Sequence, residues 1–251
     1  MLSADWLSAF LPIGVLQSSE NWVPLGAGTL FRDGPLVWFV TAQHVVRSAG
    51  EHPITVLVPN ANSDGVVIVE LSSLLQSHGI GWLEDPGNDL AASPFPLSDQ
   101  FKIKAVGIEN CIRMADVLPS MQSYTVGCPY GVRGFDPDSA MPLVMGGVIA
   151  GKAPKERLLY TSAPTFQGNS GGPLVVVKPP YDAAGNLYVG PPTVYFAGMI
   201  LEMALVKAEQ RPAGALPPLH LGIARAADVI IDLLRSPSAQ GVALQLGLAA
   251  K

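Results

Sequence analysis

Ser170 lies inside the run Gly168-Asn169-Ser170-Gly171-Gly172-Pro173-Leu174, and this run narrows the possible folds more than any other segment. Glycines on both sides of the serine let the backbone turn tightly and point successive N–H groups into one small space. A serine hydroxyl is a weak nucleophile that needs a base to take its proton and donors to hold an oxyanion. A glycine-rich turn before a strand at 173–177 would also explain these residues without any chemistry. The presence of a base and an acid elsewhere in the chain separates the two interpretations.

The best candidate for the base is His44. It follows the apolar run Leu36–Val40, which predicts a fully buried strand, and stands in Thr41-Ala42-Gln43-His44-Val45-Val46. A histidine at the end of a buried strand is held firmly and still reaches the surface. The other three histidines lie in polar or proline-rich segments and are expected in loops: His52, His78 and His220.

The third member of such a site is a carboxylate that fixes the imidazole tautomer and stabilises the imidazolium. Asp89 opens the small, apolar segment Asp89–Ala92, which would bury its carboxylate beside the imidazole. Asp85 precedes Pro-Gly and is expected in a turn, and Asp99 lies in a loop rich in proline and serine. A plain turn or cap role for Asp89 stays open.

The chain order His44, Asp89, Ser170 is that of the chymotrypsin-like (trypsin-fold) serine proteases, which this chain resembles. The resemblance is closest to the bacterial HtrA-like branch of that family. Weaker similarities to a family Gly-x-Pro-x-Gly turn and the strand after it support the resemblance, and the matches extend over most of the chain. The matching segments are Thr41–Val45, Asp89–Ala91 and Gly168–Leu174, with Val126–Gly131 and Gly147–Gly151 as the weaker ones.

The resemblance implies an all-β fold with two six-stranded antiparallel barrels, an active site in the cleft between them and a C-terminal helix. Residues 1–251 would form one trypsin-like peptidase domain, with the first barrel at about 10–95, the second at about 100–225 and the helix at 226–235. Apolar residues at one-and-four spacing predict that helix. After residue 238 we expect no room for the PDZ domain that usually follows in HtrA-like proteases.

Runs of apolar and β-branched residues place the individual strands. For the first barrel we expect strands at 10–16, 28–31, 36–40, 54–58 and 66–69. For the second we expect strands at 123–126, 144–149, 158–161, 174–177, 194–200 and 219–224, and a connection between the barrels near 94–99. The 26 glycines and 23 prolines are typical of short strands and tight turns.

The resemblance also assigns roles to the residues of the site. Ser170 would attack a peptide carbonyl and form a covalent acyl-enzyme, His44 would take its proton, and Asp89 would orient His44. The N–H groups of Gly168 and Ser170 would form the oxyanion hole. Asn169 replaces the aspartate that receives a newly cut N-terminus in the digestive proteases, which argues against activation by clipping.

The substrate pocket is expected to be neutral. By resemblance its floor is Pro164, followed by Thr165, and its walls include Ile200, Leu201 and Ile223. A basic side chain would be buried there without a counter-charge, so we expect an uncharged P1 residue. Glu202 lies one residue beyond the wall, and an alignment error of one or two residues would place an acid at the pocket.

Composition limits the partners and the compartment. The net charge of −5 offers no basic stripe for nucleic acid, and no apolar run approaches the roughly 18 residues of a membrane span. The N-terminus lacks a secretory signal, so we expect a cytoplasmic protein. Cys111 and Cys128 are too few for the disulfide framework of a secreted protease and are expected as free thiols. We predict no metal site and no cofactor.

Three functions therefore remain open. The leading expectation is a serine endopeptidase acting on a protein or peptide substrate, with one dedicated partner protein as a further expectation. The second is a protease-fold binding or regulatory module that stays inactive until a partner engages. The third is an esterase that uses the same triad. The segment Lys207–Pro218 is either an ordinary surface loop or a segment that gates the pocket or docks a partner.

Overall fold

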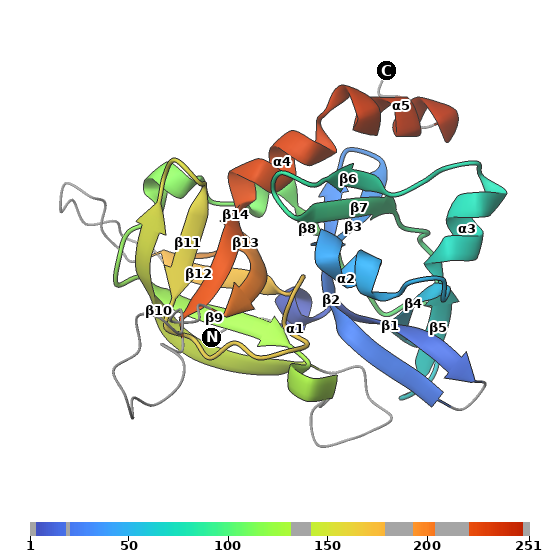
Figure 1. Cartoon of the computed structure of the whole chain (residues 1–251), viewed down its shortest axis with the longest axis horizontal. Helices are drawn as coiled ribbons and strands as arrows, with labels where there is room; N and C mark the ends of the chain where they lie inside the picture. The colour runs from blue at the N-terminus through green and yellow to red at the C-terminus, as the bar shows by residue number, and fades with distance from the viewer. Residues whose placement is uncertain (1–3, 19–20, 132–141, 179–192, 204–220, 248–251) are drawn as a thin grey trace.

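The computed structural model of the chain describes residues 4–18, 21–131, 142–178, 193–203 and 221–247 (Figure 1). It is mostly β, with one sheet built from the first half of the chain and another from the second half. The segment 207–218 and His220 lie outside the described residues. Within the described ranges, no helix is both long enough and apolar enough to cross a bilayer.

The first sheet has the strand order β5-β4-β1-β2-β3-β7-β6, with the short β8 added parallel to β2. Its neighbours along this order are all antiparallel. Its strands are β1 Phe10–Ser18, β2 Asn21–Asp33, β3 Leu36–Ala42, β4 Ile54–Pro59, β5 Val66–Glu70, β6 Leu83–Asp85, β7 Leu90–Pro94 and β8 Val106–Gly107. Three helices accompany them, α1 Ala4–Leu7, α2 Gln43–Ser48 and α3 Leu71–Ser77.

This first sheet is open, so the prediction of a closed first barrel is not confirmed. Its two edge strands, β5 and β6, are consecutive in the chain and are separated by α3. Leu71 and Leu75 are spaced by four residues and are both buried, which favours a helix at this point. A helix satisfies its backbone groups internally, so this segment cannot hydrogen-bond the two edges together.

The second sheet closes into a six-stranded barrel of order β10-β11-β14-β13-β12-β9, which confirms one of the two predicted barrels. Its strands contain the predicted ones apart from the last, predicted at 219–224, of which residues 219 and 220 lie outside the described residues; β14 begins at Gly222 and extends two residues beyond the predicted end. They are β9 Gln122–Gly127, β10 Leu143–Ala153, β11 Leu158–Thr161, β12 Pro173–Lys178, β13 Thr193–Met203 and β14 Gly222–Ala226. Three short 3-10 turns precede β10, η1 Ile108–Asn110, η2 Met114–Asp116 and η3 Pro129–Gly131.

Two helices end the described chain, α4 Ala227–Leu234 and α5 Pro237–Gln245. Figure 1 shows α4 leaving the barrel at β14 and α5 continuing over the first sheet near β6. The predicted apolar face of α4 is buried. Helix α5 was not predicted. It begins at Ser236, whose hydroxyl accepts a hydrogen bond from the N–H of Ala239, and Pro237 occupies its first turn.

One hydrophobic cluster joins the two halves of the chain. Phe196 of β13 meets Phe31 of β2 edge to face, with ring centroids 4.8 Å apart, and both rings are fully buried. Val229 and Ile230 of α4 and Trp38 of β3 belong to the same cluster. The barrel, the first sheet and α4 therefore share a core.

Phe196→Ala tests whether this core makes the halves one cooperative unit. We expect the free energy of unfolding to fall by about 3–5 kcal/mol, because a large cavity opens at a fully buried site. Denaturant unfolding followed by fluorescence and circular dichroism measures it, with one transition seen by both probes. Leu244→Ala, at a side chain that is 66% exposed, is the control and should change it by less than about 0.5 kcal/mol. Two separate transitions in the wild-type protein would contradict a shared core.

Candidate active site

A set of contacts, which we call the seam, brings the two halves together at the candidate site. It joins β2 at residues 26–29 to the serine turn, residues 166–172. The N–H of Ala27 donates to the carbonyl of Ser170 (2.8 Å), and a Cβ on Gly171 would lie only 1.9 Å from the carbonyl oxygen of Ala27. A Cβ on Gly26 would meet both the Ser170 carbonyl and Val45, the residue after His44. The seam therefore sets Ser170 beside the helix that carries His44.

The N–H groups of Gly168 and Ser170 are among those of the serine turn that make no hydrogen bond to the described residues. The N–H of Asn169 donates to the carbonyl of Phe166 (3.0 Å) and that of Gly171 to Ile200 (2.8 Å). Within the described chain, no hydrogen bond uses the N–H of Gly168 or that of Ser170. An oxyanion hole requires N–H donors of this kind, and these two belong to the serine itself and to the residue two positions before it.

The turn η3 fixes the peptide that carries one of these donors. The N–H of Tyr130 donates to the carbonyl of Gln167 (2.7 Å), and the Tyr130 ring packs on Phe166 with centroids 5.9 Å apart. In a trans peptide the C=O and N–H point in opposite directions, so this bond aims the N–H of Gly168 away from η3. Gly168 has φ +98, and a Cβ there would lie 2.4 Å from the carbonyl oxygen of Cys128. Sequence reasoning placed the turn at 126–131 but missed the role of the Tyr130 N–H.

His44 and Asp89 form a close pair, as the sequence predicts. The Nδ1–H of His44 donates to Oδ2 of Asp89 (2.7 Å), and the backbone N–H of His44 donates to Oδ1 (2.9 Å). The carboxylate thereby holds the imidazole with its proton on Nδ1 and leaves Nε2 as an acceptor. Both side chains are partly exposed to solvent.

Asp89 ends the four-residue turn that links β6 to β7. Asp85 forms the start of that turn, as predicted, and accepts a hydrogen bond from the Asn88 amide (2.7 Å). Burial raises the pKa of the Asp89 carboxyl, but the hydrogen bonds from the ring and backbone of His44 and the nearby charges outweigh it, so the pKa lies below its ordinary value. The carboxylate is therefore held in the charged form that orients a histidine.

Ser170 does not donate to His44. Its hydroxyl donates instead to the carbonyl of Leu201 (2.7 Å), at the point where β13 shifts register against β14. Leu201 is buried, and its side chain packs in the core of the first sheet. Catalytic hydrogen bonds in an unliganded site are often long or poorly aligned and tighten only when substrate binds, so this bond does not by itself exclude a pairing of Ser170 with His44.

The residues predicted for the substrate pocket lie on neighbouring elements of the barrel. The Pro164 carbonyl accepts from the Thr125 hydroxyl (3.1 Å), and Thr165 lies against Gly222, next to Ile223. Ile200 pairs with β14 and is buried, whereas Glu202 is exposed and pairs with Ile223. The Thr165 hydroxyl and the Asn169 amide are buried, and neither has a hydrogen-bond partner among the described residues.

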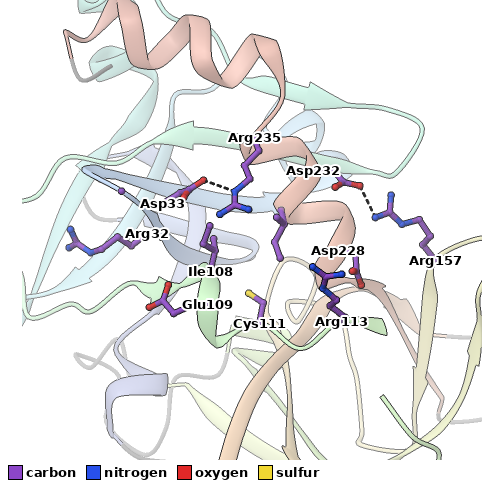
Figure 2. Close-up of a pocket in the computed structure, with 12 residues that line it drawn as sticks. Arg32, Asp33, Ile108, Glu109, Cys111, Arg113, Arg157, Asp228, Asp232 and Arg235 are labelled. Atoms are coloured by element: carbon purple, nitrogen blue, oxygen red, sulfur yellow. Dashed lines mark hydrogen bonds and ion pairs between the residues drawn. The ribbon is translucent and has the colours of Figure 1, made fainter. Parts of the chain in front are cut away.

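Other groups in the described chain offer no competing chemistry. A cavity of about 750 Å³ beside α4 is lined by four arginines, four acids and Cys111, and by none of the predicted site residues (Figure 2). Burial raises the pKa of Cys111 to about 12, so this thiol is a poor nucleophile. Cys128 is buried, and neither cysteine forms a disulfide with a described residue. No cluster of described residues has the ligands to hold a metal ion.

The pKa of Asp89 is measurable, and we expect it below the ordinary 3.8. Because the folded-state pKa is depressed, the pair with His44 stabilises the fold fully above the unfolded pKa and loses this effect as the pH falls through the folded pKa. The carboxyl ¹³C shift of Asp89, assigned by its absence in Asp89→Asn, gives the titration midpoint. A midpoint at or above 3.8 would contradict the described pair.

No protein-family model matches this chain, and no curated protein matches it. The described fold is all-β with one closed six-stranded barrel and is compatible with the trypsin-like fold. A functional assignment therefore rests on the geometry of His44, Asp89 and the serine turn.

Proposed function

We propose that the chain is a trypsin-like serine endopeptidase. It would cleave a protein or peptide substrate through His44, Asp89 and Ser170 and a covalent acyl-enzyme. The single observation that carries the proposal is the pair of free N–H groups, from Gly168 and Ser170, on the turn that holds the serine. A structural glycine turn has no need of free donors at its tip, whereas acyl transfer requires them.

Each residue then has one role in the reaction. Nε2 of His44 takes the proton of Ser170 as the hydroxyl oxygen bonds to the substrate carbonyl carbon, and Asp89 stabilises the imidazolium that forms. The N–H groups of Gly168 and Ser170 bind the developing oxyanion. The imidazolium then gives its proton to the leaving amine, and a water molecule repeats these steps to release the acyl group.

One observation favours a second function, a protease-fold module that is inactive until a partner engages. The hydroxyl of Ser170 is held by the carbonyl of Leu201 (2.7 Å) and not by His44. If only a partner could release that bond, the resting protein would have the parts of a triad without its activity. The two functions differ in whether the protein alone reacts with an acylating or phosphorylating probe.

Ser170→Ala tests the nucleophile. The wild-type protein should react with a fluorophosphonate probe and cleave peptides, and the variant should do neither, because it lacks the hydroxyl that forms the covalent bond. Mass spectrometry should place the adduct on Ser170, and unchanged circular dichroism would show that the variant is folded. Asp99→Asn, remote from the pair, is a control that should keep full activity. A wild-type protein that stays unlabelled until a partner is added would favour the second function.

The P1 preference tests the pocket. Pro164, Thr165, Ile200 and Ile223 carry no charge, so small or medium uncharged residues should be preferred by a few-fold per carbon, since each buried methylene contributes about 0.8 kcal/mol. A peptide library that varies P1 over all residues measures this, and peptide cleavage also distinguishes an endopeptidase from an esterase. A strong arginine or lysine preference that disappears in Glu202→Gln would show that the acid, and not the neutral wall, faces P1.

A further inference from the structure

Arg225 of β14 reaches out of the barrel to the turn that carries Asp89. Its Nε–H donates to the carbonyl of Asn88 (3.0 Å), and its Nη1 donates to the carbonyl of Glu156 in the turn between β10 and β11. Asn88 belongs to the first sheet, and Glu156 belongs to the barrel. The rigid, planar guanidinium therefore ties main-chain atoms of both halves to one point.

The peptide that Arg225 holds is the one immediately before Asp89. Asp89 has φ +55, a left-handed conformation that residues other than glycine seldom adopt. The carbonyl on its other side accepts a hydrogen bond from the backbone N–H of Gln43 (3.0 Å). Both peptides that flank Asp89 are thus fixed, one by helix α2 of the first sheet and the other by the barrel.

The charge of Arg225, like its hydrogen bonds, acts on Asp89. The positive charge of Arg225 is among the groups that lower the pKa of the Asp89 carboxyl, after burial, which raises it, and His44, which lowers it. Burial lowers the pKa of Arg225 itself, Asp85 and Asp89 oppose that effect, and Arg157 adds to it. An arginine remains charged in proteins, so the carboxylate always faces a cation from the barrel side.

We propose that Arg225 is a positioning residue for the His44–Asp89 pair. It fixes the main chain at Asp89 against the barrel that carries Ser170, so that the orienting carboxylate and the serine keep one relative placement. The kinetic part of this inference rests on the proposed function, while the placement of Asp89 is independent of it. Sequence reasoning missed Arg225 because it lies 136 residues from Asp89 in the chain and outside every motif.

Three variants of the full chain separate positioning from charge and from general stability. Arg225→Met removes the donors and the charge, and Arg225→Lys keeps the charge without the forked donors. Arg157→Met is the matched control. Arg157 lies in the same turn as Glu156 and pairs with Asp232 of α4 (2.7 Å, Figure 2), on the face of the cavity described above.

The first readout is the rate of fluorophosphonate labelling as a function of probe concentration. Displacing a catalytic group by about 1 Å can slow the reaction by about 10²-fold, so Arg225→Met should lower the limiting rate by about 10- to 100-fold with half-saturation unchanged. Arg225→Lys should be intermediate, because an ammonium can reach one carbonyl. Arg157→Met should stay within about 2-fold, as surface substitutions usually do.

The second readout needs no activity. In Arg225→Met the titration midpoint of the Asp89 carboxyl should rise, and the downfield proton signal of the His44 Nδ1–H should weaken, whereas Arg157→Met should leave that proton signal unchanged. Wild-type values for Arg225→Met in both readouts, or equal losses in Arg157→Met, would overturn the inference. If the wild-type protein is never labelled, the proposed function fails and the two resonance signals alone decide the role of Arg225. Should Arg225→Met not fold, Arg225→Lys and Arg225→Gln replace it.

Discussion

The seam between β2 and the serine turn is the constraint on which the rest of the site depends. His44 and Asp89 come from the open sheet and Ser170 from the barrel, so the proposed reaction would require the two halves to meet at one fixed distance. The carbonyl of Ala27 leaves no room for a side chain at Gly171, and the N–H of Ala27 binds the carbonyl of Ser170. Aromatic packing of Phe31 on Phe196 buries the same boundary farther from solvent.

Around this seam, a different neighbouring group holds each part of the proposed site. The carboxylate of Asp89 holds His44, the N–H of Tyr130 sets the Gly168 peptide, and Arg225 ties the turn before Asp89 to the barrel. The serine hydroxyl is the exception, since the carbonyl of Leu201 holds it away from the base. A serine hydroxyl that is bonded to Leu201 is consistent both with an enzyme at rest and with a module awaiting a partner.

Local patterns in the sequence sufficed for most strands, for α4 and for the approach of Asp89 to His44, because buried runs and short motifs carry that information within a few residues. They failed at α3, where Leu71 and Leu75 favour a helix and the first sheet stays open. They also missed α5, although the Ser236-Pro237 start was a usable signal. Arg225 and the Tyr130 N–H act across long separations on main-chain atoms, and no local pattern records such contacts.

The seam has one more consequence, for how such a protein can change over time. Both of its described hydrogen bonds end on main-chain carbonyls of the serine turn, one donated by the N–H of Ala27 and one by the hydroxyl of Thr29, and there is no room for a side chain at Gly26 or Gly171. Substitutions elsewhere can therefore accumulate on both faces of the boundary without moving the serine relative to the histidine. A placement that is fixed mainly by main-chain atoms can therefore persist even when most side chains have been substituted.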